Sequence, residues 1–172
     1  ITIAHDALAV VVHPQNPVNS LSSDQIRAIF AGRFSNWSTV GGTSERIHVI
    51  SREEGSGTRT AFDELIMAGS NVAARAIVQD SNGAVREAVA QDKNAIGYIS
   101  LGLVDNRVKA IEVDNVKPTL ANCRAGTYTL IRPFLFVTKE KLSASGQAFI
   151  NFVLSDDGQN LLAEEGLVTD NQ

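Results

Sequence analysis

The chain has 172 residues, of which 44% are hydrophobic and 20% charged, and these proportions suit one well-buried domain or slightly more. Its formal net charge of −4 argues against a nucleic-acid partner, because such partners select proteins with a surplus of Lys and Arg. The longest apolar run, which ends at Val12, is far shorter than the ~20 residues that a membrane-spanning helix needs.

Strand and helix patterns alternate along the chain, which predicts an α/β fold. Residues 7–12 form a continuous valine-rich run and predict a strand that is buried on both faces. Residues 20–32 predict an amphipathic helix, in which Ser22 and Gln25 form a capping box. Further along, we expect helices at residues 58–67 and 84–91, and strands at residues 47–50, 76–78, 95–100, 108–113 and 127–138.

The C-terminal segment predicts two short helices with polar caps. Ser145 is expected to cap the first helix, and Ser155 or Asp156 the second. Gly166 is a suitable C-terminal stop for the second helix, because glycine readily takes up the left-handed conformation found there.

Cysteine and histidine give no sign of a metal centre or of thiol chemistry. The one cysteine, Cys123, excludes an internal disulfide and a multi-cysteine metal cluster, and a small apolar side chain is its ordinary role. His5, His13 and His48 lack the spacing of metal ligands, and no Ser-His-Asp or Cys-His arrangement can be argued. We therefore expect no cofactor, no metal and no catalytic residue.

Residues 51–58 carry the side chains and backbone features that bind a small anion. A strand, a glycine-containing loop and a helix start present backbone N–H groups that have no partner inside the helix. Arg52 adds a planar fork suited to two oxygens of a tetrahedral oxyanion. We predict that inorganic phosphate, or a close tetrahedral anion, binds without reacting at Arg52, Ser56, Gly57 and Thr58.

The same stretch also fits a purely structural role. A Ser-Gly-Thr sequence before a helix is often only a cap and turn, and Arg52 would then be a surface cation. The nucleotide-binding loop Gly-x-x-x-x-Gly-Lys-Ser/Thr is absent, because no Lys follows Gly57. A nucleotide hydrolase is therefore poorly supported.

Several blocks, in order along the chain, carry a resemblance to one family. They are residues 7–17, residues 21–40, Arg52 to Thr58 (Arg-x-x-x-Ser-Gly-Thr), Ala95-Ile-Gly-Tyr-Ile-Ser-Leu-Gly102, Tyr128-Thr-Leu-Ile-Arg-Pro133 and residues 149–166. In this order they resemble the periplasmic phosphate-binding proteins of bacterial phosphate ABC transporters, the PstS family. The resemblance covers nearly the whole chain, and it implies that the loop at Arg52 to Thr58 holds phosphate.

The resemblance also implies a domain organisation. The fold would be like that of the type II periplasmic-binding proteins, α/β, with one complete domain (a mixed sheet with flanking helices) and the C-terminal part of a second. Residues 1–13 would be the crossover strand from domain I, residues 14–120 domain II with the phosphate half-site, and residues 121–172 the return strand and C-terminal helices of domain I. Secondary candidates for contact with the ligand are Ser81, Asn82, Gly83 and Asp6, for which a structural role is the alternative.

Members of the family carry a further segment before the point that corresponds to Ile1. That segment contributes Ser or Thr hydroxyls and an Asp, whose carboxylate accepts a hydrogen bond from a protonated oxyanion and so discriminates against sulfate. We therefore expect this chain to be a fragment, or one half of a cut or assembled molecule. Incomplete covering of domain I would favour self-association through Phe134, Phe136, Phe149, Phe152 and Leu161.

Together the residues and the resemblance predict a high-affinity solute-binding component of a phosphate ABC transporter, and not an enzyme. Its partners would be inorganic phosphate and a membrane permease, with no nucleic acid. Its location would be periplasmic or otherwise extracytoplasmic, as a cell-surface lipoprotein in a Gram-positive organism. The alternatives are a phosphate-sensing or adhesive binding module, and a receptor for another tetrahedral oxyanion.

Overall fold

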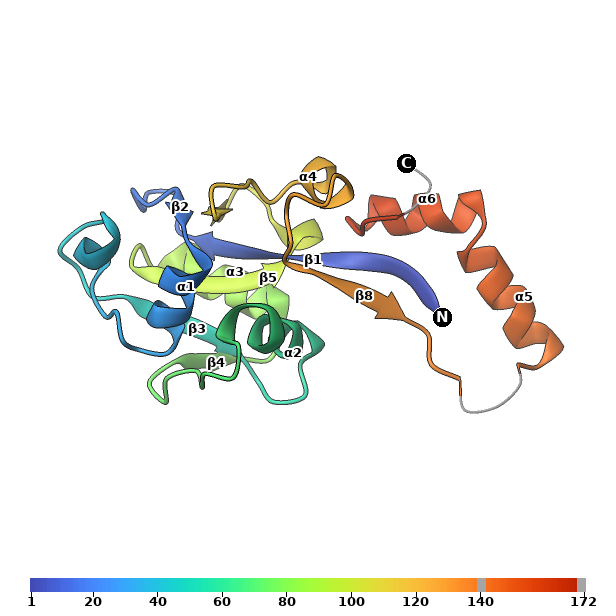
Figure 1. Cartoon of the computed structure of the whole chain (residues 1–172), viewed down its shortest axis with the longest axis horizontal. Helices are drawn as coiled ribbons and strands as arrows, with labels where there is room; N and C mark the ends of the chain where they lie inside the picture. The colour runs from blue at the N-terminus through green and yellow to red at the C-terminus, as the bar shows by residue number, and fades with distance from the viewer. Residues whose placement is uncertain (139–141, 170–172) are drawn as a thin grey trace.

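The centre of the protein is a six-stranded mixed sheet, seen in a computed structural model that describes residues 1–138 and 142–169 (Figure 1). The strand order is β4-β3-β5-β1-β6, and β8 also pairs with β1. β3 runs parallel to β4 and β5, whereas β1 is antiparallel to β5, β6 and β8. The strands are β1 (Thr2–Val12), β3 (His48–Arg52), β4 (Ile77–Gln79), β5 (Ala95–Ser100), β6 (Lys109–Ala110) and β8 (Ile131–Leu135).

Helices cover both faces of this sheet. The apolar side chains of α1 (Ser23–Phe30), α2 (Gly57–Phe62) and the π-helical turn Asp63–Met67 belong to one buried cluster, and those of α3 (Asn82–Gln91) belong to another. Residues 8–12 of β1 alternate between the two clusters and are fully buried. The prediction of a strand buried on both faces is thus confirmed, as is the α/β fold class.

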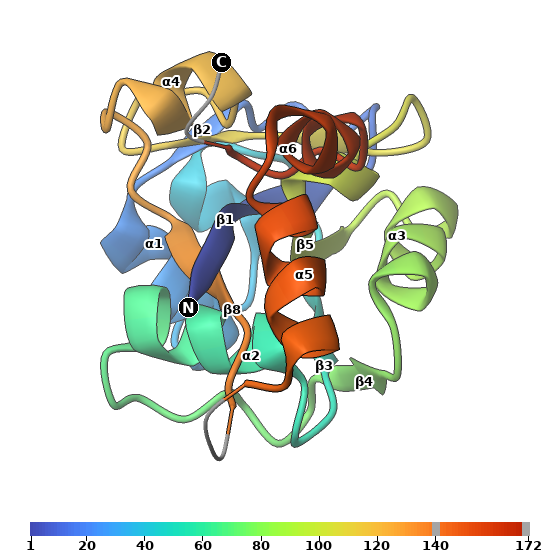
Figure 2. The ribbon, with the colours of Figure 1, turned by 90° about the vertical axis from the view of Figure 1, so that its right-hand side faces the viewer.

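β1 also leads out of the main sheet toward the C-terminal helices α5 (Ala144–Val153) and α6 (Asp156–Glu164), as Figures 1 and 2 show. It pairs with β5 at residues 8–12 and with β8 at residues 2–7. The His5 N–H donates to the Val168 carbonyl at 2.8 Å, and the Gln159 side chain donates to the Ile3 carbonyl at 2.9 Å. The first half of β1 therefore holds the C-terminal helices, and its second half lies in the core of the sheet.

The remaining elements are short. β2 (Ser20–Leu21) and β7 (Glu112–Val113) form a parallel two-stranded sheet. Two single-turn 3₁₀ helices span Trp37–Val40 and Leu101–Leu103, and α4 spans Leu120–Arg124. No helix among the described residues has the length and apolarity needed to cross a bilayer.

Several predicted boundaries need correction. The helix expected from residue 20 begins at Ser23, because Ser20 and Leu21 pair with β7; the capping box of Ser22 and Gln25 is confirmed. The strand expected at residues 108–113 is divided between β6 and β7, which pair with different strands. The strand expected at residues 127–138 is limited to Ile131–Leu135, the part that faces β1. α5 is capped by Ser143, not Ser145, and α4 was not predicted.

Candidate functional site

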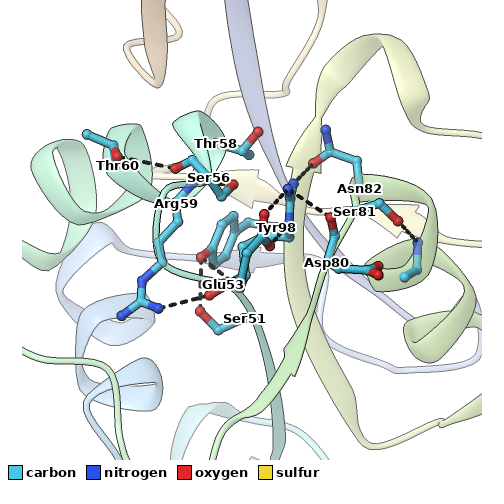
Figure 3. Close-up of polar contacts among 12 residues, drawn as sticks. Ser51, Glu53, Ser56, Thr58, Arg59, Thr60, Asp80, Ser81, Asn82 and Tyr98 are labelled. Carbon is cyan, nitrogen blue, oxygen red and sulfur yellow. Dashed lines mark hydrogen bonds and ion pairs between the residues drawn. The ribbon is translucent and has the colours of Figure 1, made fainter.

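The predicted anion-binding loop connects the end of β3 to the start of α2 (Figure 3). Ser56 caps α2, because its Oγ accepts a hydrogen bond from the Arg59 N–H at 3.2 Å. Gly55 has φ +87°, a left-handed conformation that favours glycine and turns the chain into the helix. The capping role that the sequence offered as the structural alternative is therefore present at Ser56.

Two backbone N–H groups at the start of α2 have no acceptor within the described part of the chain. They belong to Gly57 and Thr58, and the next two amides along the chain, those of Arg59 and Thr60, both donate to Ser56. Free amides at a helix start carry the positive end of the helix dipole. With the hydroxyls of Ser56 and Thr58, they form a compact set of donors for an anion.

The guanidinium of Arg52, the last residue of β3, is largely engaged by protein oxygens. Its Nε and Nη2 donate to the Glu53 carboxylate at 2.9 and 3.0 Å, and Nη1 donates to Asn82 Oδ1 at 3.1 Å. Nη2 also donates to the Asp80 carbonyl at 3.5 Å, which leaves a single N–H, on Nη1, without an acceptor among the described residues. Hydrogen bonding by Arg52 lowers the pKa of Glu53. The fork predicted for the anion is thus directed mainly at Glu53.

The secondary candidates at the start of α3 lie across from the loop (Figure 3). Asn82 is brought to the site, since its Oδ1 accepts the hydrogen bond from Arg52. Ser81 caps α3 by accepting from the Ala84 N–H at 3.1 Å. A Cβ on Gly83 would meet only Ser81 Oγ, at 3.9 Å. The structure therefore joins Asn82 to the predicted site and gives Ser81 the structural role.

Asp6 is connected to the loop through Arg132, a residue that the sequence analysis did not assign. The two residues face each other on β1 and β8, and Arg132 donates to Asp6 Oδ2 from Nε at 3.0 Å and from Nη2 at 2.8 Å. The other carboxylate oxygen of Asp6 accepts from Ser100 Oγ at 2.5 Å. Arg132 Nη2 also donates to Thr58 Oγ1 at 3.3 Å. Asp6, whose side chain is buried, is therefore joined to the loop by one intermediate residue.

A signal for Arg132 was present in the sequence. One of the two strands expected to cross between domains carries the acidic residue Asp6, and the other carries the basic residue Arg132, both in largely apolar surroundings. A buried carboxylate requires a cationic or hydrogen-bonding partner, so the presence of Asp6 predicts one. Only the register of β1 with β8 identifies that partner as Arg132.

Tyr98 of β5 fixes the end of β3 on which the site stands. Its Oη lies 3.0 Å from Ser51 Oγ and accepts from the Arg52 backbone N–H at 3.3 Å. Its ring stacks on Phe62 of α2, with centroids 3.9 Å apart and an angle of 4° between the planes. Burial raises the pKa of Tyr98. One side chain therefore holds both the strand before the loop and the helix after it.

The chemistry of the site is that of hydrogen-bond donors and cations. Among residues 1–138 and 142–169, no group of three or more His, Cys, Asp or Glu side chains could hold a metal ion. The guanidinium groups of Arg52 and Arg132 donate to oxygen atoms, and their carboxylate partners are Glu53 and Asp6. This arrangement can hold an oxyanion in place.

Comparisons with known proteins agree with this chemistry. The family described as "PBP superfamily domain" matches residues 1–157. The phosphate-binding protein PstS of Bacillus subtilis (strain 168) is 30% identical over 168 residues, which are 96% of this chain and 56% of that protein. The phosphate-binding protein PstS 2 of Streptococcus pneumoniae is 44% identical over 133 residues, which are 73% of this chain and 46% of that protein. The chain thus spans about half the length of these curated relatives.

Two crystal structures resemble the chain over 98% of its length. One is a putative phosphate ABC transporter substrate-binding protein with bound phosphate from Clostridium perfringens. It is 40% identical with a TM-score of 0.92, and the match covers 70% of that chain. The other is an ABC-type phosphate transport receptor from Vibrio cholerae, which is 38% identical with a TM-score of 0.88, and the match covers 71% of that chain.

Proposed function

The chain belongs to the PBP superfamily, among the PstS-like phosphate-binding proteins, and on this basis we propose that it binds inorganic phosphate for uptake by an ABC transporter. The observation that carries the proposal is the pair of Gly57 and Thr58 amides, which have no acceptor among the described residues and lie beside two hydroxyls and the guanidinium of Arg132. Such donors replace the water around a small oxyanion, and the helix dipole adds to their attraction.

Arg52 takes part by exchanging one anionic partner for another. In the structure its fork holds the carboxylate of Glu53, whose side chain is 38% exposed. An incoming phosphate offers the same planar pair of oxygens with more charge, and Glu53 can turn into water. The Glu53 carboxylate thus occupies the position that we assign to two phosphate oxygens.

The decisive variant is Arg52→Ala, measured by calorimetry with inorganic phosphate. We expect binding to weaken by about 1.5 to 3 kcal/mol, the range for a hydrogen-bonding partner of a charged group. Arg107→Ala is the control, because Arg107 is also paired with carboxylates, those of Asp105 and Glu87, in an exposed position. Equal affinity of the Arg52 variant and the unaltered chain would reject the assignment.

Competition between anions separates phosphate uptake from the alternative of a receptor for another oxyanion. Arsenate has the shape and protonation of phosphate and should displace it, whereas sulfate and molybdate should not. We propose no chemical step at this site. Release of phosphate from a generic ester, in proportion to the amount of protein and lost in Arg52→Ala, would contradict that part of the proposal.

The partner and location follow from the same proposal. A membrane permease would receive the phosphate, and the chain would act in the periplasm or at the outer surface of the cell. In the proposed domain organisation, residues 14–120 form domain II with the phosphate half-site, and residues 1–13 and 121–172 belong to domain I. The pairing of β1 with β8, and the contacts of Ile3 and His5 with the C-terminal segment, support this organisation.

We also propose that the apolar surface of β8, α5 and α6 mediates association between copies of the chain. Its exposed side chains include Phe134, Phe149, Phe152 and Leu161, and the ring of Phe136 packs against that of Phe149 with centroids 5.6 Å apart. Size-exclusion chromatography with light scattering should show a species larger than the monomer, and Phe149→Ser with Phe152→Ser should restore the monomer. A monomer that binds no apolar dye would reject this proposal.

A further inference from the structure

Arg132 presents an unused edge of its guanidinium to the start of α2. Its Nε and Nη2 donate to Asp6 and Thr58, whereas Nη1 has no acceptor among the described residues. Nη1 lies 2.8 Å from the position that a Cβ would take on Gly57. We infer that Arg132 is a second arginine of the anion site, positioned by Asp6, and this inference rests on the proposed binding of phosphate.

The ion pair with Asp6 holds Arg132 in a fixed orientation. The two residues are direct partners in the antiparallel register of β1 and β8. The Asp6 side chain is 2% exposed and is held on its other oxygen by Ser100 Oγ, so the carboxylate itself cannot move to water. A cation fixed before the ligand arrives loses little side-chain entropy on binding. Asp6 is thus a positioning residue.

Arg132 and Arg52 differ in how many of their N–H groups have an acceptor among the described residues, and this difference decides which guanidinium can bind the anion first. Arg52 keeps one free N–H and must release Glu53 before it can hold two oxygens. Neither N–H group of Arg132 Nη1 has an acceptor within residues 1–138 and 142–169. The first charge-assisted hydrogen bonds to the anion therefore come from Arg132, and Arg52 follows when Glu53 has turned away.

Gly57 and Thr58 fit this role of Arg132. A methyl group on Gly57 would be 2.8 Å from Nη1, closer than carbon and nitrogen approach without displacement, so glycine keeps the helix start open beside the guanidinium. Thr58 Oγ1 accepts from Nη2, which leaves its own hydrogen available for a ligand. The anion would therefore contact the β3–α2 loop and β8 together.

The test uses a double variant, Asp6→Asn with Arg132→Gln, in the full 172-residue chain. Removing Arg132 alone would leave a buried, unpaired carboxylate and destabilise the fold, whereas the amide pair stays neutral and hydrogen-bonded. We expect calorimetry with inorganic phosphate to show at least about a tenfold loss of affinity, the equivalent of one lost charge-assisted bond. Arg86→Gln is the matched control, because Arg86 is 22% exposed and paired with Asp105, and Arg132 is 21% exposed.

A second measurement needs no variant of the site. In the unaltered chain, the side-chain Nε–H signal of Arg132 in nitrogen-15 NMR should shift on addition of phosphate, while that of Arg86 should not. The inference is overturned if the double variant binds phosphate within twofold of the unaltered chain, or if the Arg132 signal does not move. In that case a loss of binding in Arg52→Ala would still support the proposed function. No binding of phosphate by the unaltered chain overturns both.

Discussion

Replacing Tyr98 by Phe removes one hydroxyl and leaves the rest of a fully buried ring in place. The ring keeps its stack on Phe62, so the change isolates two hydrogen bonds, to Ser51 Oγ at 3.0 Å and from the Arg52 N–H at 3.3 Å. Ser51 and the backbone of Arg52 are then left buried without a partner, at about 1 to 3 kcal/mol for each such group. The second bond is long, so we expect a total loss of about 2 kcal/mol in the free energy of unfolding.

Urea denaturation followed by circular dichroism measures this loss in the free energy of unfolding. In a thermal scan the same loss should lower the melting temperature by about 4 to 8 °C for a chain of this size. Tyr128→Phe is the matched control. Tyr128 is equally buried, but its hydroxyl makes one bond, to the Leu8 carbonyl at 2.7 Å. Ser51→Ala in the Tyr98→Phe background should recover part of the loss, because it removes one orphaned group. A Tyr98→Phe loss below about 0.5 kcal/mol would show that water or local movement satisfies these groups.

Two further predictions concern the core. Gly97→Ala places a methyl 2.8 Å from Val85 Cγ1 and 3.1 Å from Val89 Cγ2, so α3 must move away from β5. We expect urea denaturation to show a loss of about 1 to 3 kcal/mol in the free energy of unfolding, and unchanged stability would contradict this packing. Burial raises the pKa of Tyr98 and Tyr128 above their ordinary value of 10. Above pH 10 the unfolded chain loses these protons first, so stability is complete below pH 10 and falls as the pH rises further. Melting temperatures across this range should show a smaller fall in the double Phe variant, and an equal fall would refute the assignment to the two tyrosines.

Local sequence patterns predicted the elements whose stability is decided within the element or by simple burial. The valine-rich run of β1, the capping box of α1 and the apolar β5 were all identified, because periodicity and side-chain caps act over a few residues. The errors lie where pairing with a distant strand sets the boundary. Ser20 and Leu21 pair with β7, and the strand around Ile131–Leu135 extends only as far as β1 provides a partner.

For the candidate site, too, the local features could be predicted from the sequence and the long-range contacts could not. The Arg-x-x-x-Ser-Gly-Thr loop and its helix start were visible in the sequence, and the structure brings Ser56, Gly57 and Thr58 together as the first residues and cap of α2. The partners of the charged groups were not visible. Arg52 is held by Glu53 next to it and by Asn82, 30 residues away. The sequence alone does not distinguish an Arg52 bound to protein oxygens from an Arg52 open to an anion.

The sequence by itself determined the family, the α/β class and the loop that presents unpartnered amides, because a glycine-containing turn before a helix exposes them wherever it occurs. Only the tertiary structure decided which cations stand beside that loop and which of their N–H groups remain free. Asp6 and Arg132 are 126 residues apart, and the register between β1 and β8 alone makes them partners. Hydrogen bonds depend on distances of a few tenths of an ångström, and such distances are set when strands from the two ends of the chain pair.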